Sequence, residues 1–243
     1  MKFAFLLTQS LDSPSGLGRY GPLAREFIRL GHEVELLALH YDWSNLKEKS
    51  YLDHGVRINY VGQMHVRKEG PRKTYFGPGE LLWVAMKSTI QLAKALRRSD
   101  AEIVQICKPQ PMNTLAARLG AQGRPIFCDC DDYEAETTLF TNQWQKRIVQ
   151  YFEDGIITYA SGITVNTIFS FKRFEALGYT KQPLVYVPNG VERSRFSVQT
   201  DPVHIQKQWG IDPNQLTILY IGTLGIQSHP VDLLLDAFAN VIK

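Results

Sequence analysis

The sequence has little of what secreted, fibrous and membrane-spanning proteins depend on. Its 243 residues include three cysteines, Cys107, Cys128 and Cys130, and no CxxC pair. Three unevenly spaced cysteines do not build a disulfide framework, so we expect a reducing compartment. No stretch approaches the roughly 20 apolar residues that span a bilayer. The charge excess is also small, with 27 Lys and Arg against 24 Asp and Glu, which is too mild to indicate nucleic-acid binding.

What remains is the composition of a folded globular protein. Apolar residues make up 44% and charged residues 21% of the chain, which is close to average for such proteins. The length exceeds one typical domain of roughly 100–200 residues. The apolar run 3–7 resembles a signal peptide only superficially, because it stops at Thr8 and no small-residue cleavage site follows. We therefore predict a buried first strand there.

Short apolar runs alternate with amphipathic stretches along the chain. The runs that predict strands are 3–7, 33–39, 102–106, 125–129, 163–165, 184–187 and 216–221. A first helix should end at Gly31, and a helix from near Gly79 should bury Leu82, Ala85, Met86, Ala93 and Leu96 on one face. This alternation predicts an α/β fold, a Rossmann-like parallel sheet with helices on both faces. Ligands in such sheets bind beyond the carboxyl ends of the strands.

A change of composition near Pro188 predicts a domain boundary. We expect an N-terminal domain over 1–188 and a connector over 189–214, which carries turn-forming Asn-Gly and Asp-Pro pairs. Residues 215–243 would begin a second α/β domain. One strand and one helix cannot bury their apolar faces alone, so we expect this second domain to be truncated.

A glycine motif follows the first predicted strand. Residues 16–21, Gly-Leu-Gly-Arg-Tyr-Gly, match GxGxxG, in which glycines let the backbone approach a phosphate at a helix N-terminus. Asp42 lies about 20 residues on, where a dinucleotide site places its ribose-binding acid. In such a site the first glycine directly follows the strand, whereas here 8–15 intervene. The motif therefore favours a longer, mobile loop that closes over a ligand from another domain. The alternatives are an NAD site and glycines that only ease a turn.

An acidic cluster ends the strand predicted over 125–129. It reads Asp129-Cys130-Asp131-Asp132-Tyr133, and strand alternation puts Asp129 and Asp131 on one side. Clustered carboxylates mark hydroxyl-binding, acid–base or metal sites. Four interpretations stay open: an acceptor-binding or catalytic carboxylate, a metal-binding DxD, the nucleophilic DxD of haloacid-dehalogenase-like phosphatases, and a solvated loop. The phosphatase motif normally lies on the first strand. The neighbouring cysteines lack further ligands for a metal.

Two other features bear on function. The basic run 67–73 precedes an amphipathic helix and could touch anionic lipid or a phosphorylated acceptor, although such runs are more often solvated loops. The six histidines define no triad with any serine or cysteine, so nucleophilic hydrolysis has no support.

Several segments, taken in order, resemble the family-four glycosyltransferases. They are the loop and first helix (15–31), Ser-Gly-Ile-Thr-Val-Asn at 161–166, Val-Pro-Asn-Gly-Val-Glu at 187–192 ending at Phe196, and 218–224 followed by 232–238. The resemblance runs the whole length of the chain. It implies a GT-B fold, two Rossmann-like domains facing each other across a cleft. It also implies transfer of a sugar from a nucleotide-sugar donor, with retention, to a glycan, lipid or small-molecule acceptor.

The resemblance also implies roles for individual residues. The donor side would be Gly16, Gly18, Gly222 and Thr223. The catalytic candidates are Asp131, which stands where many members carry a histidine, and Asp129. The acceptor side would be Lys108, Asp132, Tyr133 and Asn189. No metal and no other cofactor is expected, because helix N-termini would stabilise the leaving diphosphate.

Two alternative functions remain open. Thr223 and His229 stand where the family carries cations that neutralise the donor pyrophosphate, which leaves room for a non-catalytic glycan- or lipid-acceptor-binding domain or split subunit. The glycine motif leaves room for an NAD-binding oxidoreductase. The expected partners are the nucleotide sugar, the acceptor and the missing C-terminal domain, without nucleic acid. The expected location is the cytoplasm, where the protein could also contact the inner face of the membrane. We expect the 243 residues alone to bind acceptor weakly and not to turn over.

Overall fold

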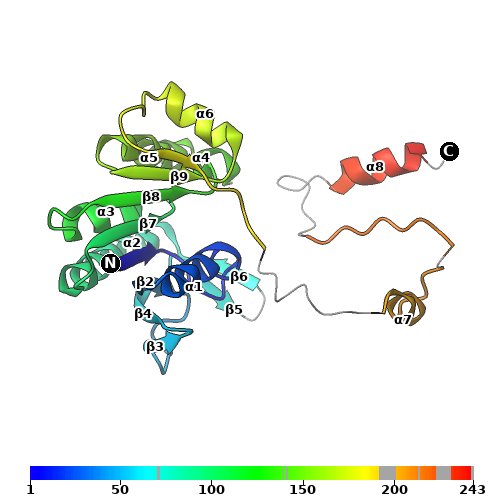
Figure 1. Ribbon diagram of the computed structural model, residues 1–243, viewed down its shortest axis with the longest axis horizontal. Helices are drawn as coiled ribbons and strands as arrows, with labels where there is room; N and C mark the ends of the chain where they lie inside the picture. The colour runs from blue at the N-terminus through cyan, green and yellow to red at the C-terminus, as the bar shows by residue number, and fades with distance from the viewer. Residues whose placement is uncertain are drawn as a thin grey trace. The chain divides into compact units, whose positions relative to one another are not determined.

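The computed structural model describes residues 1–69, 72–138, 140, 142–191, 201–212, 214–222 and 231–241 (Figure 1). The chain divides into two compact units, Met1–Val191 and Glu192–Lys243.

An eight-stranded sheet forms the centre of the first unit, in the order β10-β9-β8-β7-β1-β2-β4-β3 (Figure 1). The strands are β1 Lys2–Leu7, β2 Glu33–His40, β3 Ser50–Asp53, β4 Val56–Gln63, β7 Ile103–Cys107, β8 Ile126–Cys130, β9 Gly162–Val165 and β10 Leu184–Tyr186. All neighbours pair in parallel except β3, which is antiparallel to β4. The carboxyl ends of the parallel strands therefore lie at one edge of the sheet.

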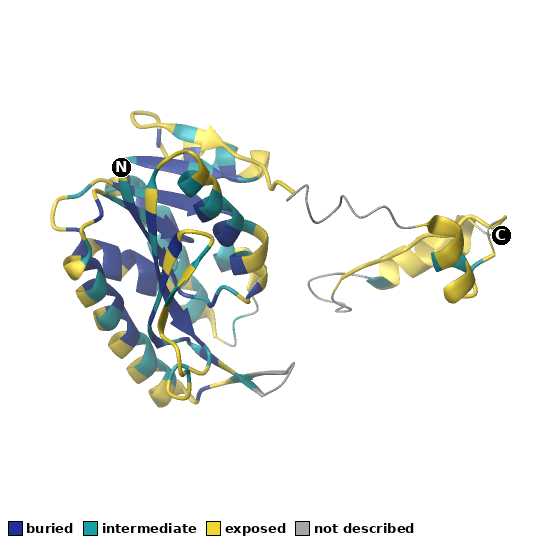
Figure 2. Ribbon diagram, turned by 60° about the horizontal axis from the view of Figure 1, so that its bottom comes forward, coloured by how far each residue is buried: buried dark blue, intermediate teal, exposed yellow. Residues whose placement is uncertain are grey.

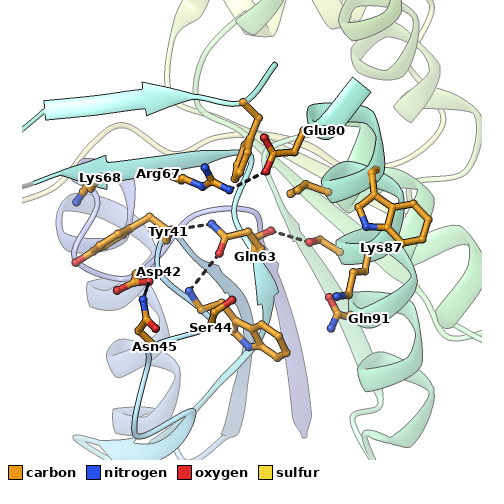
Figure 3. A pocket seen from close by; sticks show the side chains of 15 residues that line it. Tyr41, Asp42, Ser44, Asn45, Gln63, Arg67, Lys68, Glu80, Lys87 and Gln91 are labelled. Carbon is orange, nitrogen blue, oxygen red and sulfur yellow. Dashed lines mark hydrogen bonds and ion pairs between the residues drawn. The ribbon is translucent and has the colours of Figure 1, made fainter. Parts of the chain in front are cut away.

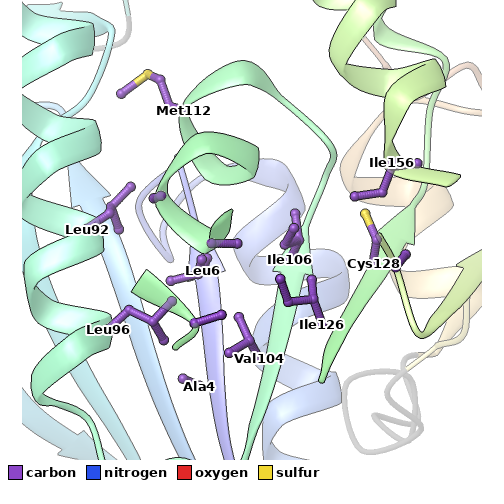
Figure 4. Close-up of a cluster of buried hydrophobic side chains, with 14 of the residues drawn as sticks. Ala4, Leu6, Leu92, Leu96, Val104, Ile106, Met112, Ile126, Cys128 and Ile156 are labelled. Atoms are coloured by element: carbon purple, nitrogen blue, oxygen red, sulfur yellow. The ribbon is translucent and has the colours of Figure 1, made fainter. Parts of the chain in front are cut away.

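Both faces of this sheet are covered. Successive side chains of a strand point to opposite faces, and β1 accordingly places Ala4 and Leu6 in one core cluster and Phe5 and Leu7 in another. Helices α2 (Pro78–Arg98) and α3 (Pro111–Gly120) cover the first cluster, and α1 (Gly21–Arg29) packs on the second. Figure 4 shows the first cluster, with Leu92 and Leu96 of α2 beside the strands. The predicted Rossmann-like α/β fold is confirmed.

The first unit also holds several further elements. They are the π-helical turn η1 (Gly16–Tyr20), the hairpin of β5 (Val66–Glu69) and β6 (Arg72–Tyr75), α4 (Glu134–Thr137), α5 (Gln143–Gly155), the 3₁₀ turn η2 (Ile156–Thr158) and α6 (Ile168–Ala176). Gly31 has φ +83°, so it ends the first helix in the left-handed conformation that was expected of it. The basic run 67–73 was expected to be a loop, but residues on either side of its centre form this antiparallel hairpin.

The expected buried face of α2 is only partly correct. Ala93 and Leu96 are buried, but Leu82 and Met86 are 63% and 51% exposed. No side chain from Pro78 to Lys87 is buried, and burial begins at Ser88. The helix therefore starts before it reaches the core, and its first turns consist of exposed and intermediate residues (Figure 2).

All three cysteines are buried, and none of them forms a disulfide. Cys128 and Cys130 belong to the first core cluster and Cys107 to the second. The two neighbouring sulfurs lie 3.7 Å apart. Burial raises the pKa of each thiol, most strongly for Cys107 and Cys128.

The second unit holds helices α7 (Pro202–Gln208) and α8 (Val231–Val241). Asp201 caps α7, because its carboxylate accepts a hydrogen bond of 3.0 Å from Val203 N. The predicted strand over 216–221 is wrong for the described residues, where no ladder forms. Leu216 and Ile221 are 92% and 86% exposed. An apolar run forms a stable strand only when partner strands and a packed face are present.

No helix in the described part of the chain combines the length and the apolar character that crossing a bilayer requires.

Candidate functional site

Polar side chains gather where neighbouring strands end at the carboxyl edge of the sheet. Lys108 follows β7, Asp129 and Asp131 lie at the end of β8, and Thr164 lies on β9. Residues of β8 pair in register with β7 and β9, with Asp129 opposite both Cys107 and Thr164. The sheet therefore positions these groups side by side.

Arg19 and Asp129 form a bidentate ion pair at this edge. The Arg19 Nε donates to Asp129 Oδ2 at 2.6 Å and its Nη2 donates to Oδ1 at 2.7 Å. The side chains are only 11% and 2% exposed. Thr164 Oγ1 donates to the same Oδ1 at 2.5 Å. Burial alone would lower the pKa of Arg19, but the hydrogen bonds and charge of Asp129 raise it above its usual value, so the guanidinium stays charged.

The same guanidinium also reaches the chain beyond β10. Its Nη1 donates to Asn189 Oδ1 at 2.7 Å, and Nη2 lies 3.4 Å from Val187 O. Arg19 thereby joins the glycine motif, the end of β8 and the last residues of the first unit. Asn189, predicted on the acceptor side, is held in place by this contact.

Lys108 is a buried lysine in an uncommon backbone conformation. Its φ of 75° lies in the left-handed region, which costs a residue other than glycine about 1–3 kcal/mol and is found disproportionately at functional sites. Asn113 Nδ2 supports this turn by donating to Cys107 O at 2.8 Å and to Lys108 O at 3.3 Å.

The ammonium of Lys108 is surrounded by three carboxylates. It lies 3.2 Å from Asp131 Oδ1, 3.1 Å from Asp132 Oδ2 and 2.7 Å from Glu134 Oε1. Burial lowers the pKa of Lys108, but Asp131 and Glu134 outweigh it, so the pKa lies above its usual value. These carboxylates are close enough together to hold a metal ion. The ammonium of Lys108 already contacts all three carboxylates, so it supplies the positive charge that a metal ion would bring.

The carboxyl group of Asp131 has a pKa well above its ordinary value. Burial raises the pKa of Asp131 to about 6; Lys108 lowers it, and the charges of Asp132 and Asp129 raise it further. A group with such a pKa can hold or accept a proton under ordinary conditions, which suits acid–base chemistry.

Glu153 of α5 supports this cluster from behind. Its buried carboxylate accepts hydrogen bonds from Glu134 N at 2.7 Å and Ala135 N at 2.9 Å, the first amides of α4. These bonds fix the turn that carries Asp132 and Glu134. Burial raises the pKa of Glu153 to about 7, although the two N–H groups lower it in part.

The substitution Glu153→Gln should flatten the pH dependence of stability. The folded-state pKa lies above the ordinary value, so this group stabilises the fold below about pH 4.5 and loses that contribution as the pH rises through about 7. Urea unfolding between these pH values should show a falling free energy of unfolding in the parent chain and a shallower fall in the variant. Glu136→Gln, at an exposed position of α4, is the control, and equal slopes in all three proteins would contradict the assignment.

The two predicted donor-side glycines of the first unit differ in their surroundings. They lie in the π-helical turn instead of an open loop, with Gly21 N–H donating to Gly16 O. A Cβ on Gly16 would lie 2.5 Å from Leu11 O and 2.6 Å from Leu11 Cα, whereas one on Gly18 would meet nothing within 4 Å. Gly16 is thus needed for packing, and Gly18 is open to solvent.

Gly16→Ala should therefore destabilise the chain by about 1–3 kcal/mol, because the backbone of Leu11 cannot move away as a flexible side chain could. Gly18→Ala is the matched control and should be neutral or stabilising by about 0.5–1 kcal/mol in this helical turn. Thermal and urea unfolding measure both changes. Equal stabilities of the two variants would show that Leu11 does not restrict position 16.

The structure places the other predicted residues separately. The Arg173 guanidinium lies 3.7 Å over the ring of Tyr133. Gly222 belongs to the second unit, where an added Cβ would approach the Tyr220 hydroxyl to 2.7 Å. Thr223 and His229 lie outside the described residues. Among the predicted residues, Lys108, Asp131 and Asp132 are therefore brought into contact, and Asp129 is linked to Asn189 through Arg19.

Sequence reasoning missed the partners that hold these groups. Arg19 was interpreted only as part of the glycine motif, and Thr164, Glu134 and Glu153 were given no role. A cation between two glycines and a glutamate after an acidic run are signals in hindsight. Neither reveals its partner, since Arg19 and Asp129 are 110 residues apart.

A cavity of about 530 Å³ opens elsewhere in the first unit (Figure 3). It lies between the segment after β2, the β5–β6 hairpin and the start of α2. Gln63 braces it, donating from Nε2 to Tyr41 O at 2.7 Å, while Ser88 Oγ donates to Gln63 O at 2.6 Å. Its lining mixes aromatic, amide and charged side chains, among them Tyr41, Asp42, Trp43, Asn45, Gln63, Arg67, Lys68, Phe76, Glu80, Trp83, Lys87 and Gln91. Of these side chains, only Asp42, as a possible ribose-binding acid, and the basic pair Arg67 and Lys68 were singled out from the sequence.

The doubly wound sheet, with charged groups at its carboxyl edge, defines a Rossmann-like domain, a class in which ligands bind at that edge. The model of Glycosyltransferase Family 4 matches residues 22–195. The chain therefore belongs to Glycosyltransferase Family 4. No curated protein sequence matches the chain.

Solved structures show the same fold at low sequence identity. Sucrose-phosphate synthase from Thermosynechococcus elongatus matches with a TM-score of 0.73 and 12% identity, covering 99% of this chain and 60% of that one. MnaA of S. aureus, in a co-structure with UDP, matches with a TM-score of 0.53 and 12% identity, covering 86% of this chain and 50% of that one. The chain thus spans between half and two thirds of the length of these two proteins. The likeness establishes a GT-B glycosyltransferase fold.

Proposed function

We propose that this chain supplies the acceptor-binding part of a glycosyltransferase that moves a sugar from a nucleotide-sugar donor to an acceptor with retention of configuration. Membership of Glycosyltransferase Family 4 over residues 22–195 carries the proposal. The similar fold of MnaA was solved together with UDP, which supports a nucleotide-containing donor. In this proposal 1–188 forms the acceptor domain, 189–214 the connector and 215–243 the start of the donor domain.

Asp131 is the group that would accept a hydrogen bond from the acceptor hydroxyl. Its pKa of about 6 lets it be mostly ionised, yet able to take a proton, at neutral pH. Lys108 would hold that carboxylate in place and, with Asp132 and Glu134, keep the local charge balanced. Asp129 would act indirectly, by fixing Arg19 and, through it, Asn189.

The donor would approach from the side of the glycine motif. Gly18 leaves open space where a Cβ would point, so a diphosphate could come close to the backbone there. The donor-side roles of Gly222 and Thr223 stay predictions from the family resemblance. Electrostatic stabilisation of the leaving diphosphate by helix amides and the site's cations would make a metal unnecessary.

The cavity between β2, the hairpin and α2 would take the distal part of the acceptor. Tyr41 follows β2 and Gln63 ends β4, so the cavity opens at the same carboxyl edge as Asp131. Aromatic faces with a few amide and charged groups are typical of sites that orient polar organic ligands.

Isotope-labelled nucleotide sugars tested against a panel of acceptors will decide the reaction, with a protein that carries the whole donor domain, because the 243 residues alone are expected not to turn over. Transfer should give a glycoside whose anomeric proton coupling matches that of the donor sugar. An inverted product would refute retention. Saturable acceptor binding by that protein, without transfer from any nucleotide sugar, would favour the non-catalytic alternative.

A further inference from the structure

Positive charge is concentrated in one continuous part of the chain. Residues 66–98, which form the β5–β6 hairpin and helix α2, contain eight Lys and Arg and only two acidic residues. The whole chain has an excess of only three positive charges, so the remainder is net negative. One of the two acids, Glu80, is already paired with Arg67 at 2.7 Å.

Exposed apolar side chains lie in the same part. On α2, Leu82, Trp83, Met86 and Ile90 are 63%, 63%, 51% and 48% exposed. At 3.6 residues per turn, Leu82, Met86 and Ile90 line up along the helix, with Trp83 in the next row. Lys87 and Lys94, both exposed, lie on the same side of this line as Trp83. These six residues are called the α2 face below.

We propose that the α2 face docks on the surface of an anionic lipid bilayer. Helices that lie in a membrane interface combine an apolar stripe, often with tryptophan, and flanking lysines that attract anionic headgroups. The α2 face has this arrangement, and the basic hairpin directly precedes it. A protein partner could also cover apolar side chains, but the one-sided charge of 66–98 is complementary to a uniformly negative surface.

This inference does not depend on the proposed sugar transfer. It does have a consequence for the cavity, because Trp83 and Lys87 also line it. Docking through α2 would bring this lining to the headgroup region, where an amphiphilic ligand could enter.

Co-sedimentation of the 243-residue chain with vesicles tests the proposal. The chain should bind vesicles of phosphatidylglycerol and phosphatidylcholine and not vesicles of phosphatidylcholine alone. The double variant Lys87→Gln/Lys94→Gln should bind about 25-fold more weakly, at about fivefold per basic residue lost. Trp83→Ser/Met86→Ser should weaken binding about tenfold or more through the lost apolar contact. These side chains are exposed, so thermal unfolding midpoints should stay close to that of the parent chain.

Matched controls come from other exposed positions of the first unit. Lys172→Gln/Lys181→Gln removes two exposed lysines outside 66–98, and Trp144→Ser removes a tryptophan of α5 that is 59% exposed. Both should bind like the parent chain. The proposal is overturned if the chain ignores anionic vesicles, or if the controls weaken binding as much as the α2 variants. It is also overturned if sedimentation without lipid shows a dimer that Met86→Glu dissociates, because the face would then bind a second copy.

Discussion

Asp129→Ala should lower the free energy of unfolding by about 3–5 kcal/mol, the range measured when one partner of a buried ion pair is removed. Asp129 accepts both hydrogen bonds of the Arg19 fork and that of Thr164. Its loss would leave a guanidinium that is only 11% exposed without its counter-ion. Urea unfolding at neutral pH measures the effect.

A double-mutant cycle separates pairing from packing. Arg19→Met and Asp129→Leu should each be destabilising, while the double variant should lose less than the sum, because no buried charge is then left unpaired. Additive effects would show that the two side chains do not stabilise one another. The surface pair Arg29–Glu26, 2.6 Å apart but well exposed, is a control that should show a coupling of less than about 1 kcal/mol.

In a protein that carries the whole donor domain, Asp131→Asn should lower kcat for sugar transfer by about 10²- to 10⁴-fold, since an amide cannot accept the proton of an acceptor hydroxyl. In the parent enzyme kcat/KM should rise with pH through about 6 as Asp131 ionises. The variant should lack this rise. Initial rates across pH 4.5–8 with a labelled donor measure both effects.

Stability should respond to the same titration in the opposite direction. The folded-state pKa of Asp131 is raised, so its contribution to stability is present below about pH 4 and is lost as the pH passes about 6.

Asp132→Asn is the matched control for the activity of Asp131→Asn, because Asp132 also contacts Lys108 but its side chain is 53% exposed. It should change KM more than kcat. An Asp131→Asn enzyme as active as the parent would remove Asp131 from the reaction.

Most of the sheet could be predicted because its central strands are buried on both faces and form short apolar runs. Strand β4 was missed, although Val56, Ile58 and Tyr60 alternate with more exposed residues in the pattern of a half-buried strand. The hairpin could not be predicted from apolar pattern, since its residues are largely charged. Within the hairpin and beside it, contacts such as Arg67 over the Phe76 ring at 4.3 Å involve charged side chains.

The candidate site divides in the same way. Asp129 and Asp131 could be predicted because they directly follow a buried run, which places them at the carboxyl edge. The partners that set their chemistry come from far along the chain. Nothing near Lys108 in the sequence indicates a left-handed backbone, which Asn113 supports through the carbonyls of Cys107 and Lys108.

The three enclosed thiols give the first unit a built-in reporter of opening. Because burial raises the pKa of Cys107, Cys128 and Cys130, almost no thiolate is present at neutral pH, and the thiolate is the form that alkylating reagents attack. Modification must therefore wait for the strands that carry them to separate. The rate at which iodoacetamide alkylates the native protein would then measure how often the centre of the sheet opens, without an engineered cysteine.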